Sequence, residues 1–107
     1  MKMTISELQE SALSTAISTG RFDAFEQFES HLAHLHCEVA EVGQAYRARR
    51  LDGWKAQDGK PEGVAVELAD VVILAASIAG FYGLDLSAAI SEKMEYNKGR
   101  ICEEMRG

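Results

Sequence analysis

The sequence predicts an all-α fold in which four antiparallel helices form one domain over residues 1–107. Between residues 25 and 46, apolar side chains recur at steps of three and four, which is the period of one helix face. Glycines, the only proline and a capping aspartate divide the chain into four segments of helical length. Alternation of apolar and polar residues, which is typical of strands, never extends beyond four residues.

The four helices are expected over about residues 4–18, 22–50, 61–83 and 86–104. The first ends near Gly20 and the third near Gly83, because glycine readily adopts the backbone conformation that closes a helix. Pro61 suits the first turn of the third helix, where its missing N–H is not needed. Asp85 is a favourable N-cap for the fourth helix, and residues 51–60 form the one sizeable loop.

The second helix has the clearest apolar seam. Its members are Phe25, Phe28, Leu32, Leu35, Val39, Val42 and Tyr46. Such a heptad-like seam is typical of helices packed in a bundle. A second stripe lies about 100° further round the helix and borders the core. It contains His31, His34, Glu38, Glu41 and Ala45. Because a small domain buries only a modest fraction of its surface, such an apolar face would favour oligomerisation.

The overall charge and the cysteines limit the class of protein. The net charge of −6 and the lack of a long basic run argue against a nucleic acid polymer as partner. Cys37 and Cys102 lie far apart without a CxxC motif, which is typical of reduced thiols. The first residues contain no apolar stretch of the signal-peptide kind, so we expect a cytoplasmic protein.

Residues 63–84 are long and apolar enough to raise the question of a membrane span. They carry two charges, Glu67 and Asp70, and each would cost roughly 2.5–3.5 kcal/mol at the centre of a bilayer. Polar helices are expected on both sides. We therefore interpret the segment as the central helix of a soluble bundle, without a membrane partner.

Four acidic residues occur as two pairs with the same spacing. Glu38 and Glu41 lie one turn apart on the second helix, and Glu67 and Asp70 repeat this spacing on the third. A buried carboxylate must be paired, protonated or bound to a metal, and the third helix has no neighbouring lysine or arginine. Alone, the first pair reads as a solvated face. Together, the two pairs predict an all-oxygen site that suits Mg²⁺ or Mn²⁺.

The fourth helix contributes three polar residues at helical spacing. Lys93, Asn97 and Arg100 are separated by four and three residues, so they share one face. Such a face can clasp phosphate oxygens.

These motifs read EVAEVGQAY, PEGVAVELADVVILAASIAG, GLDL and KMEYNKGR, and 25 residues separate the two acidic pairs. Through these motifs, the segment from about residue 32 to residue 100 resembles the MazG-like family of all-α nucleoside triphosphate pyrophosphatases. After Arg100 the chain departs from many relatives, which continue with a proline and then a histidine. Here Ile101 and Cys102 follow instead.

The resemblance implies four-helix units that form dimers or larger oligomers, with active sites at subunit interfaces. It implies that Glu38, Glu41, Glu67 and Asp70 hold Mg²⁺ and are the catalytic residues. The reaction would split a nucleoside or deoxynucleoside triphosphate into monophosphate and pyrophosphate, as housecleaning of the nucleotide pool. One of the four carboxylates would act as general base. Lys93 and Asn97 would lie near the phosphates and sugar of the substrate, with Arg100 beside them.

Other side chains are candidates for contacts with the substrate. Trp54, in the loop, either stacks on a nucleobase or packs as an apolar lid. His34 shares a face with Glu38 and either borders the site or is a partly buried structural histidine. Cations around the loop either balance the charge of a triphosphate or are ordinary solvated residues. They are Arg47, Arg49, Arg50, Lys55 and Lys60.

Two other functions compete with this hypothesis. One is a non-catalytic helical module, a dimeric regulatory or adaptor protein that keeps the fold. The other is a carboxylate-bridged di-iron bundle, which normally supplies Glu-x-x-His ligands. No histidine of this chain follows an acid by three residues, so the sequence disfavours di-iron chemistry.

Overall fold

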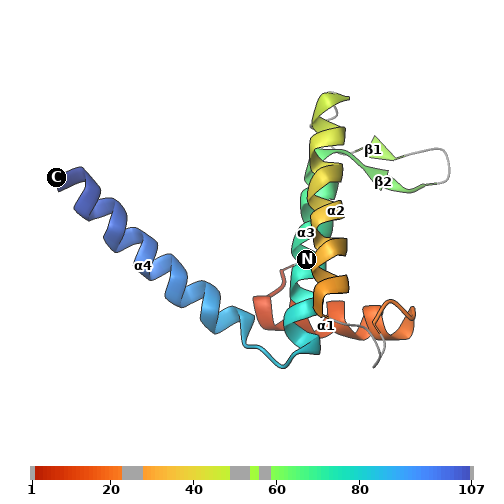
Figure 1. Cartoon of the computed structure of the whole chain (residues 1–107), viewed down its shortest axis with the longest axis horizontal. Helices are drawn as coiled ribbons and strands as arrows, with labels where there is room; N and C mark the ends of the chain where they lie inside the picture. Colours follow the sequence, from red (N-terminus) through yellow and green to blue (C-terminus); the bar gives the residue numbers. More distant parts are fainter. Residues whose placement is uncertain (1, 23–27, 49–53, 56–58, 107) are drawn as a thin grey trace.

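The computed structural model describes the chain except for residues 1, 23–27, 49–53, 56–58 and 107, and for the side chains of residues 54–55 and 101–106. It contains four helices and two short strands (Figure 1). In chain order they are α1 (Ile5–Ser18), α2 (Phe28–Arg47), β1 (Trp54–Lys55), β2 (Pro61–Glu62), α3 (Val64–Phe81) and α4 (Leu86–Arg106). The predicted all-α class and the number of helices are confirmed for the described part of the chain.

α1 begins and ends where the sequence predicts. The Thr4 hydroxyl accepts a hydrogen bond from the Glu7 amide at 3.0 Å, and the Thr4 amide donates to the Glu7 carboxylate at 3.0 Å. This reciprocal capping satisfies two N–H groups at the helix start. After the last turn, Gly20 has a φ of 75°, a conformation that costs glycine little.

The start of α3 differs from the prediction. Pro61 does not open the helix but lies in β2, which pairs antiparallel with β1 in the register Lys55↔Pro61 and Trp54↔Glu62. Gly63 follows with a φ of 117°, which is incompatible with a continuing helix, so α3 begins at Val64. A two-stranded ribbon tolerates proline because each strand has an edge that needs no donor. The weak strand signals had hidden this short hairpin.

α2 packs alongside α3, whereas α1 lies across the C-terminal part of α3 (Figure 1). The first turn of α2 meets the last turn of α3, where the rings of Phe28 and Tyr82 lie 5.4 Å apart. α1 approaches α3 closely at Gly80, where an added Cβ would lie 3.2 Å from the Leu13 side chain. The lack of a side chain at Gly80 therefore permits this close helix contact.

The core of the single chain is small. Its buried hydrophobic residues are Ala12, Ala16, Phe22, Leu74, Ala76, Ile78 and Ala79. His31 is 2% exposed and packs among aromatic rings, with its centroid 4.2 Å from that of Phe22. Four of the seven hydrophobic residues are alanines, so one chain buries little apolar surface by itself.

Much of the predicted apolar seam of α2 is exposed. Leu35 and Val42 are half-buried, whereas Leu32 and Val39 are 41% and 53% exposed. The exposed apolar surface continues on the neighbouring helix.

On α3, Leu68 and Val72 are each 51% exposed. By length and composition alone α3 could cross a membrane, since its mean hydropathy is 2.1, yet only 28% of it is buried in one chain. Helices that form the core of soluble proteins have the same composition.

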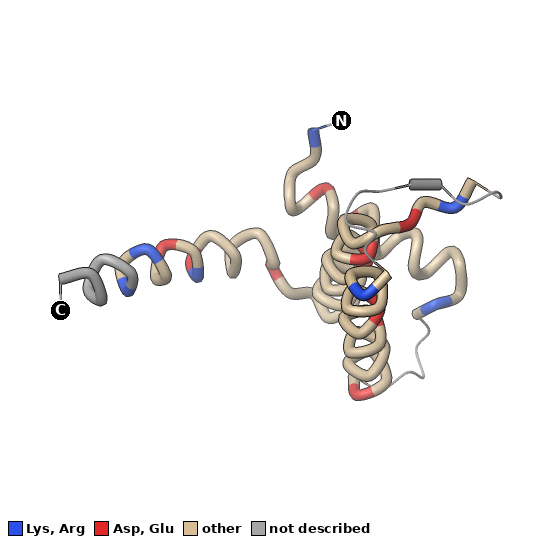
Figure 2. The backbone as a smooth tube through the Cα atoms, turned by 90° about the horizontal axis from the view of Figure 1, so that it is seen from above, with Lys and Arg blue, Asp and Glu red and all other residues tan. Residues whose placement is uncertain are grey.

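α4 leaves the rest of the molecule as an extended arm (Figures 1 and 2). It contacts α1 and α3, and within the described residues it does not contact α2. Its start is capped as predicted, because the Ala88 amide donates to the Asp85 carboxylate at 3.0 Å. Figure 2 shows charges of both signs along this arm.

Candidate functional site

Three of the predicted acids converge between α2 and α3. Glu38 on α2 and Glu67 and Asp70 on α3 each offer one carboxylate oxygen, and these oxygens all lie within 4.8 Å of one another. We call these three residues the acid cluster. The one-turn spacing places Glu67 and Asp70 on the same side of α3, and the packing of α2 against α3 brings Glu38 opposite them.

Glu41 lies at the edge of the acid cluster. Its side chain shares a hydrogen bond with Glu67, one turn of α2 beyond Glu38. Glu41 is exposed and lines the adjoining cleft, as Glu38 and Asp70 do. All four predicted acids therefore meet in one region of the molecule.

The environment of Glu67 disfavours its ionised form. Burial raises the pKa of this carboxyl, and the negative charges of Asp70, Glu41 and Glu38 raise it further. Its Oε2 atom is buried and has no hydrogen-bond partner among the described residues. A cation at this position would supply the missing partner and favour ionisation.

The donor set fits a hard divalent cation. The acid cluster offers only carboxylate oxygens, which Mg²⁺ and Mn²⁺ prefer, and Mg²⁺ is normally held by one or two carboxylates together with waters and substrate phosphates. The exposed Asp70 leaves the cluster open on the side of the cleft. The residues present are therefore suited to a metal that also binds a ligand.

His34 contacts the acid cluster through Glu38. Its Nε2 atom lies 3.2 Å from the Glu38 carboxylate, one helical turn away on α2. The side chain of Glu38 is 15% exposed and that of His34 is 43% exposed. His34 therefore orients Glu38 from the outer side of the cluster, as partners of metal-binding carboxylates commonly do.

A cleft of about 680 Å³ adjoins the acid cluster, and its volume is within the range of small-molecule sites. Glu38, Glu41 and Asp70 line one part of it. Another part of the lining comes from α1 and its C-cap and consists of small, apolar and hydroxyl side chains. These are Leu8, Ser11, Ala12, Thr15, Ala16 and Thr19.

Two cations also line the cleft. Lys60 belongs to the basic group around the loop, as the sequence indicates, whereas Arg21 follows α1 and was not predicted. The segment before residue 30 carries no motif. The only signal in the sequence that α1 would line the cleft is its small residues at helical spacing. With acids and bases in one cleft, the site can hold a metal and an anion together.

The structure does not bring the predicted residues of α4 to the acid cluster of the same chain. Lys93, Asn97 and Arg100 lie on the arm, and none of them lines the cleft. The Lys93 ammonium instead lies 4.9 Å from the centre of the Tyr96 ring. The backbone of Trp54 pairs with Glu62, and its side chain is outside the described part of the structure.

No family model, no curated protein and no solved structure matches the chain.

Proposed function

We propose that this chain is a Mg²⁺-dependent nucleoside triphosphate pyrophosphohydrolase that converts an NTP or dNTP to the monophosphate and pyrophosphate. The proposal is carried by one observation, the convergence of Glu38, Glu67 and Asp70 beside a cleft of about 680 Å³. Removal of non-standard or deoxy nucleotides from the cytoplasmic pool is the role that such an activity would serve.

Glu38, Glu67 and Asp70 would hold the cation, with Glu41 next to them. When bound, Mg²⁺ supplies positive charge to the triphosphate oxygens and makes water more acidic. Mn²⁺ prefers the same ligands. The buried oxygen of Glu67 supports this assignment, because its negative charge needs a compensating partner.

Glu41 is the general base in this proposal. It lies beside the cluster, faces the cleft and remains accessible to solvent, so it can take a proton from water. The water oxygen forms a bond to the α-phosphorus, and the bond from that phosphorus to the oxygen bridging to the β-phosphate breaks. Pyrophosphate departs with the bond's electron pair. His34 keeps Glu38 oriented during this step.

The cleft gives the substrate a place next to the acids. Lys60 and Arg21 bring positive charge to the same space, and charge-assisted hydrogen bonds to phosphate oxygens are among the strongest available. The small residues of α1 leave room for the nucleoside. Phosphoryl transfer requires mainly positioning and charge neutralisation, which this arrangement supplies.

The functional form would be a homo-oligomer, a dimer or tetramer of antiparallel four-helix units. The exposed apolar residues of α2 and α3 favour it. Val39 follows Glu38 and Leu68 follows Glu67, so on each helix the exposed apolar stripe lies about 100° round from an acid. A second copy on this face would cover it without blocking the cleft. A self-complementary helical seam is typical of such two-fold interfaces.

In this oligomer, α4 of one copy would carry Lys93, Asn97 and Arg100 to the cleft of another. The arm extends away from its own acid cluster, so these residues do not line the cleft of their own chain (Figure 1). Asn97 lies on the face of α4 that also contains Ile90 and Lys93, so docking of this face would place polar groups beside apolar ones.

Pyrophosphate release from a panel of NTPs and dNTPs with Mg²⁺ tests the proposal. Wild type and Glu38→Gln are measured side by side, with Glu29→Gln as the matched control. Glu29 is an exposed acid in the first turn of the same helix and lies outside the cleft. We expect turnover in wild type and Glu29→Gln and none in Glu38→Gln. A folded wild type that hydrolyses no member of the panel would contradict the proposal.

A further inference from the structure

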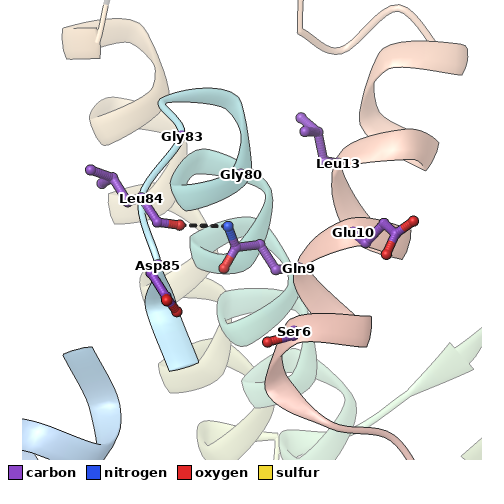
Figure 3. Close-up of a pocket in the computed structure, with 8 residues that line it drawn as sticks. All are labelled: Ser6, Gln9, Glu10, Leu13, Gly80, Gly83, Leu84 and Asp85. Carbon is purple, nitrogen blue, oxygen red and sulfur yellow. Dashed lines mark hydrogen bonds between the residues drawn. The ribbon is translucent and has the colours of Figure 1, made fainter. Parts of the chain in front are cut away.

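The corner between α3 and α4 is held by one side chain of α1 (Figure 3). The amide nitrogen of Gln9 donates a hydrogen bond to the carbonyl oxygen of Leu84 at 2.6 Å. The amide oxygen of the same side chain accepts one from the backbone N–H of Leu86 at 3.2 Å. Gln9 thus links α1 to a segment more than seventy residues away in the sequence.

A primary amide is the side chain that this corner requires. The Leu84 carbonyl can only accept a hydrogen bond and the Leu86 N–H can only donate one, so their partner must do both. A carboxylate would accept from Leu86 but oppose the Leu84 carbonyl, and an apolar side chain would lose both bonds. Leu86 is the first residue of α4, whose N–H has no partner within the helix.

Few side chains brace this corner, although the Leu84 amide donates to the Ala79 carbonyl at 2.8 Å and so closes the end of α3. A cavity of about 400 Å³ opens beside Gln9, where side-chain packing would otherwise fix the turn (Figure 3). Gly83 allows the turn through a φ of 67°, a conformation that sets the chain direction but adds no side-chain contact. α1 itself is firmly seated, because Leu13 packs closely against Gly80 of α3. Gln9 therefore reaches from a fixed helix to a weakly supported corner.

The direction of α4 depends on this corner because the helix is a long lever. Its 21 residues extend about 30 Å at 1.5 Å per residue. A rotation of about 20° at the start would therefore move the far end by about 10 Å. From residue 91 to residue 100 the helix is exposed except at Asn97, so the body of the chain does not restrain it there.

We propose that Gln9 is a positioning residue for α4, and that its side-chain amide sets the direction in which the arm leaves the molecule. The consequence for catalysis rests on the function proposed above. With the corner fixed, Lys93, Asn97 and Arg100 are held away from their own acid cluster and presented to the cleft of a second copy. Gln9 touches no substrate in this arrangement and acts through α4.

The distance between two spin labels measures the direction of the arm. One label is placed on the native Cys37, which is exposed on α2, and the other on Glu95→Cys of α4, with Cys102→Ala as background. Excess unlabelled chain is added so that distances arise within one chain. We compare wild type with Gln9→Met. The matched control is Glu10→Met, because Glu10 is the next residue, lines the same cavity and makes no side-chain hydrogen bond within the described structure.

A single narrow distance is expected for the parent and for Glu10→Met. Gln9→Met should give a broad distribution while the helix content by circular dichroism is unchanged. An equally narrow, unshifted distance in a folded Gln9→Met would overturn the proposal.

Gln9→Glu supplies a second readout that a merely structural role would not give. A protonated carboxyl, like the amide, donates at one end and accepts at the other, whereas the ionised form cannot donate. The distance should therefore be broad at pH 8 and narrow again as the pH falls through the titration of the introduced carboxyl. A distribution that does not respond to pH would contradict the assignment, even if Gln9→Met failed to fold.

Turnover separates this inference from the proposed function. The distance measurements need no activity, so they decide the role of Gln9 even if the chain hydrolyses no nucleotide. In an active protein, Gln9→Met should raise KM more than it lowers kcat, because the acid cluster is intact. If the arm became disordered and the kinetics did not change, α4 would have no role in the active site. Hydrolysis by the acid cluster would still stand.

Discussion

The acid cluster and the α4 arm differ in how far a single chain assembles them. Both were predicted from residues three or four apart on one helix. Glu38, Glu67 and Asp70 come within 4.8 Å of one another, because α2 and α3 pack along their lengths. Lys93 and Asn97 share their face as expected but do not line the cleft beside the acid cluster, because α4 contacts α1 and α3, and not α2, within the described residues. Spacing determines a face, and packing determines what that face meets.

The largest expected effect comes from removing a ligand within the acid cluster. Asp70→Asn should lower kcat/KM by more than about 100-fold, because even the outer partners of metal ligands contribute 10–100-fold. Glu62→Gln, a half-buried acid in β2, is the control and should retain activity. Steady-state pyrophosphate release checks both. If Asp70→Asn gained stability and lost no function, a non-catalytic adaptor would be the better interpretation.

Mixing experiments test whether the arm acts on another copy. Lys93→Ala should also lose most activity, yet a refolded one-to-one mixture with Asp70→Asn should recover about a quarter of the wild-type rate. Half of the dimers are then mixed, and one of their two sites has both intact parts. The recovered pyrophosphatase rate is the measurement. If the mixture were no more active than its components, the arm and the acids would act within one chain, or the arm would have no role in the site.

The exposed apolar face provides the next test. Leu68→Arg should dissociate the oligomer, because it places a charge at the centre of the surface that a second copy would cover. Ser14→Arg, on the exposed surface of α1 outside both cavities, should leave the mass unchanged. Light scattering during size-exclusion chromatography measures the mass. A monomeric wild type, or recruitment of the protein to lipid vesicles instead, would contradict a second copy as the partner.

The smallest expected effect is the pH dependence of stability without metal. The pKa of Glu67 is raised in the folded chain, so folding favours its protonated form. The stability from this group is therefore present below the pKa of the unfolded chain and is lost as the pH rises through the folded pKa. Metal-free protein should melt a few degrees higher at pH 5 than at pH 7.5, and Glu67→Gln should flatten this difference.

Addition of Mg²⁺ should reverse the trend, because the cation binds the ionised carboxylate and stabilises the folded state more at higher pH. Thermal melts at both pH values, with and without Mg²⁺, provide the measurement. A pH dependence that survives Glu67→Gln unchanged would assign it to other groups.

The sequence predicted the helices better than their surroundings. Gly20, Gly83 and Asp85 mark helix boundaries through local chemistry, so the sequence indicated their positions. Pro61 was placed wrongly because its fixed φ suits both a helix start and a strand edge. Pairing with Lys55 decided between them.

The candidate site was predictable only in part for the same reason. The acids repeat a spacing that can be recognised in the sequence, and the structure brings them together. Arg21 and the wall of α1 have no such spacing relative to the acids, and they reach the cleft only through the packing of α1 on α3. Gln9 is likewise unremarkable in sequence, since its partners are backbone groups near the far end of α3.

Calorimetric titration of the purified protein with Mn²⁺ and with Mg²⁺ at pH 7.5 tests the central claim most directly. Wild type and Glu29→Gln should bind the cation saturably, and Glu67→Gln should lose this binding while remaining folded, because its amide supplies no charge to the site. Equal, non-saturating heats in all three proteins would mean that Glu38, Glu67 and Asp70 hold no cation, and the proposed hydrolysis would lose its basis.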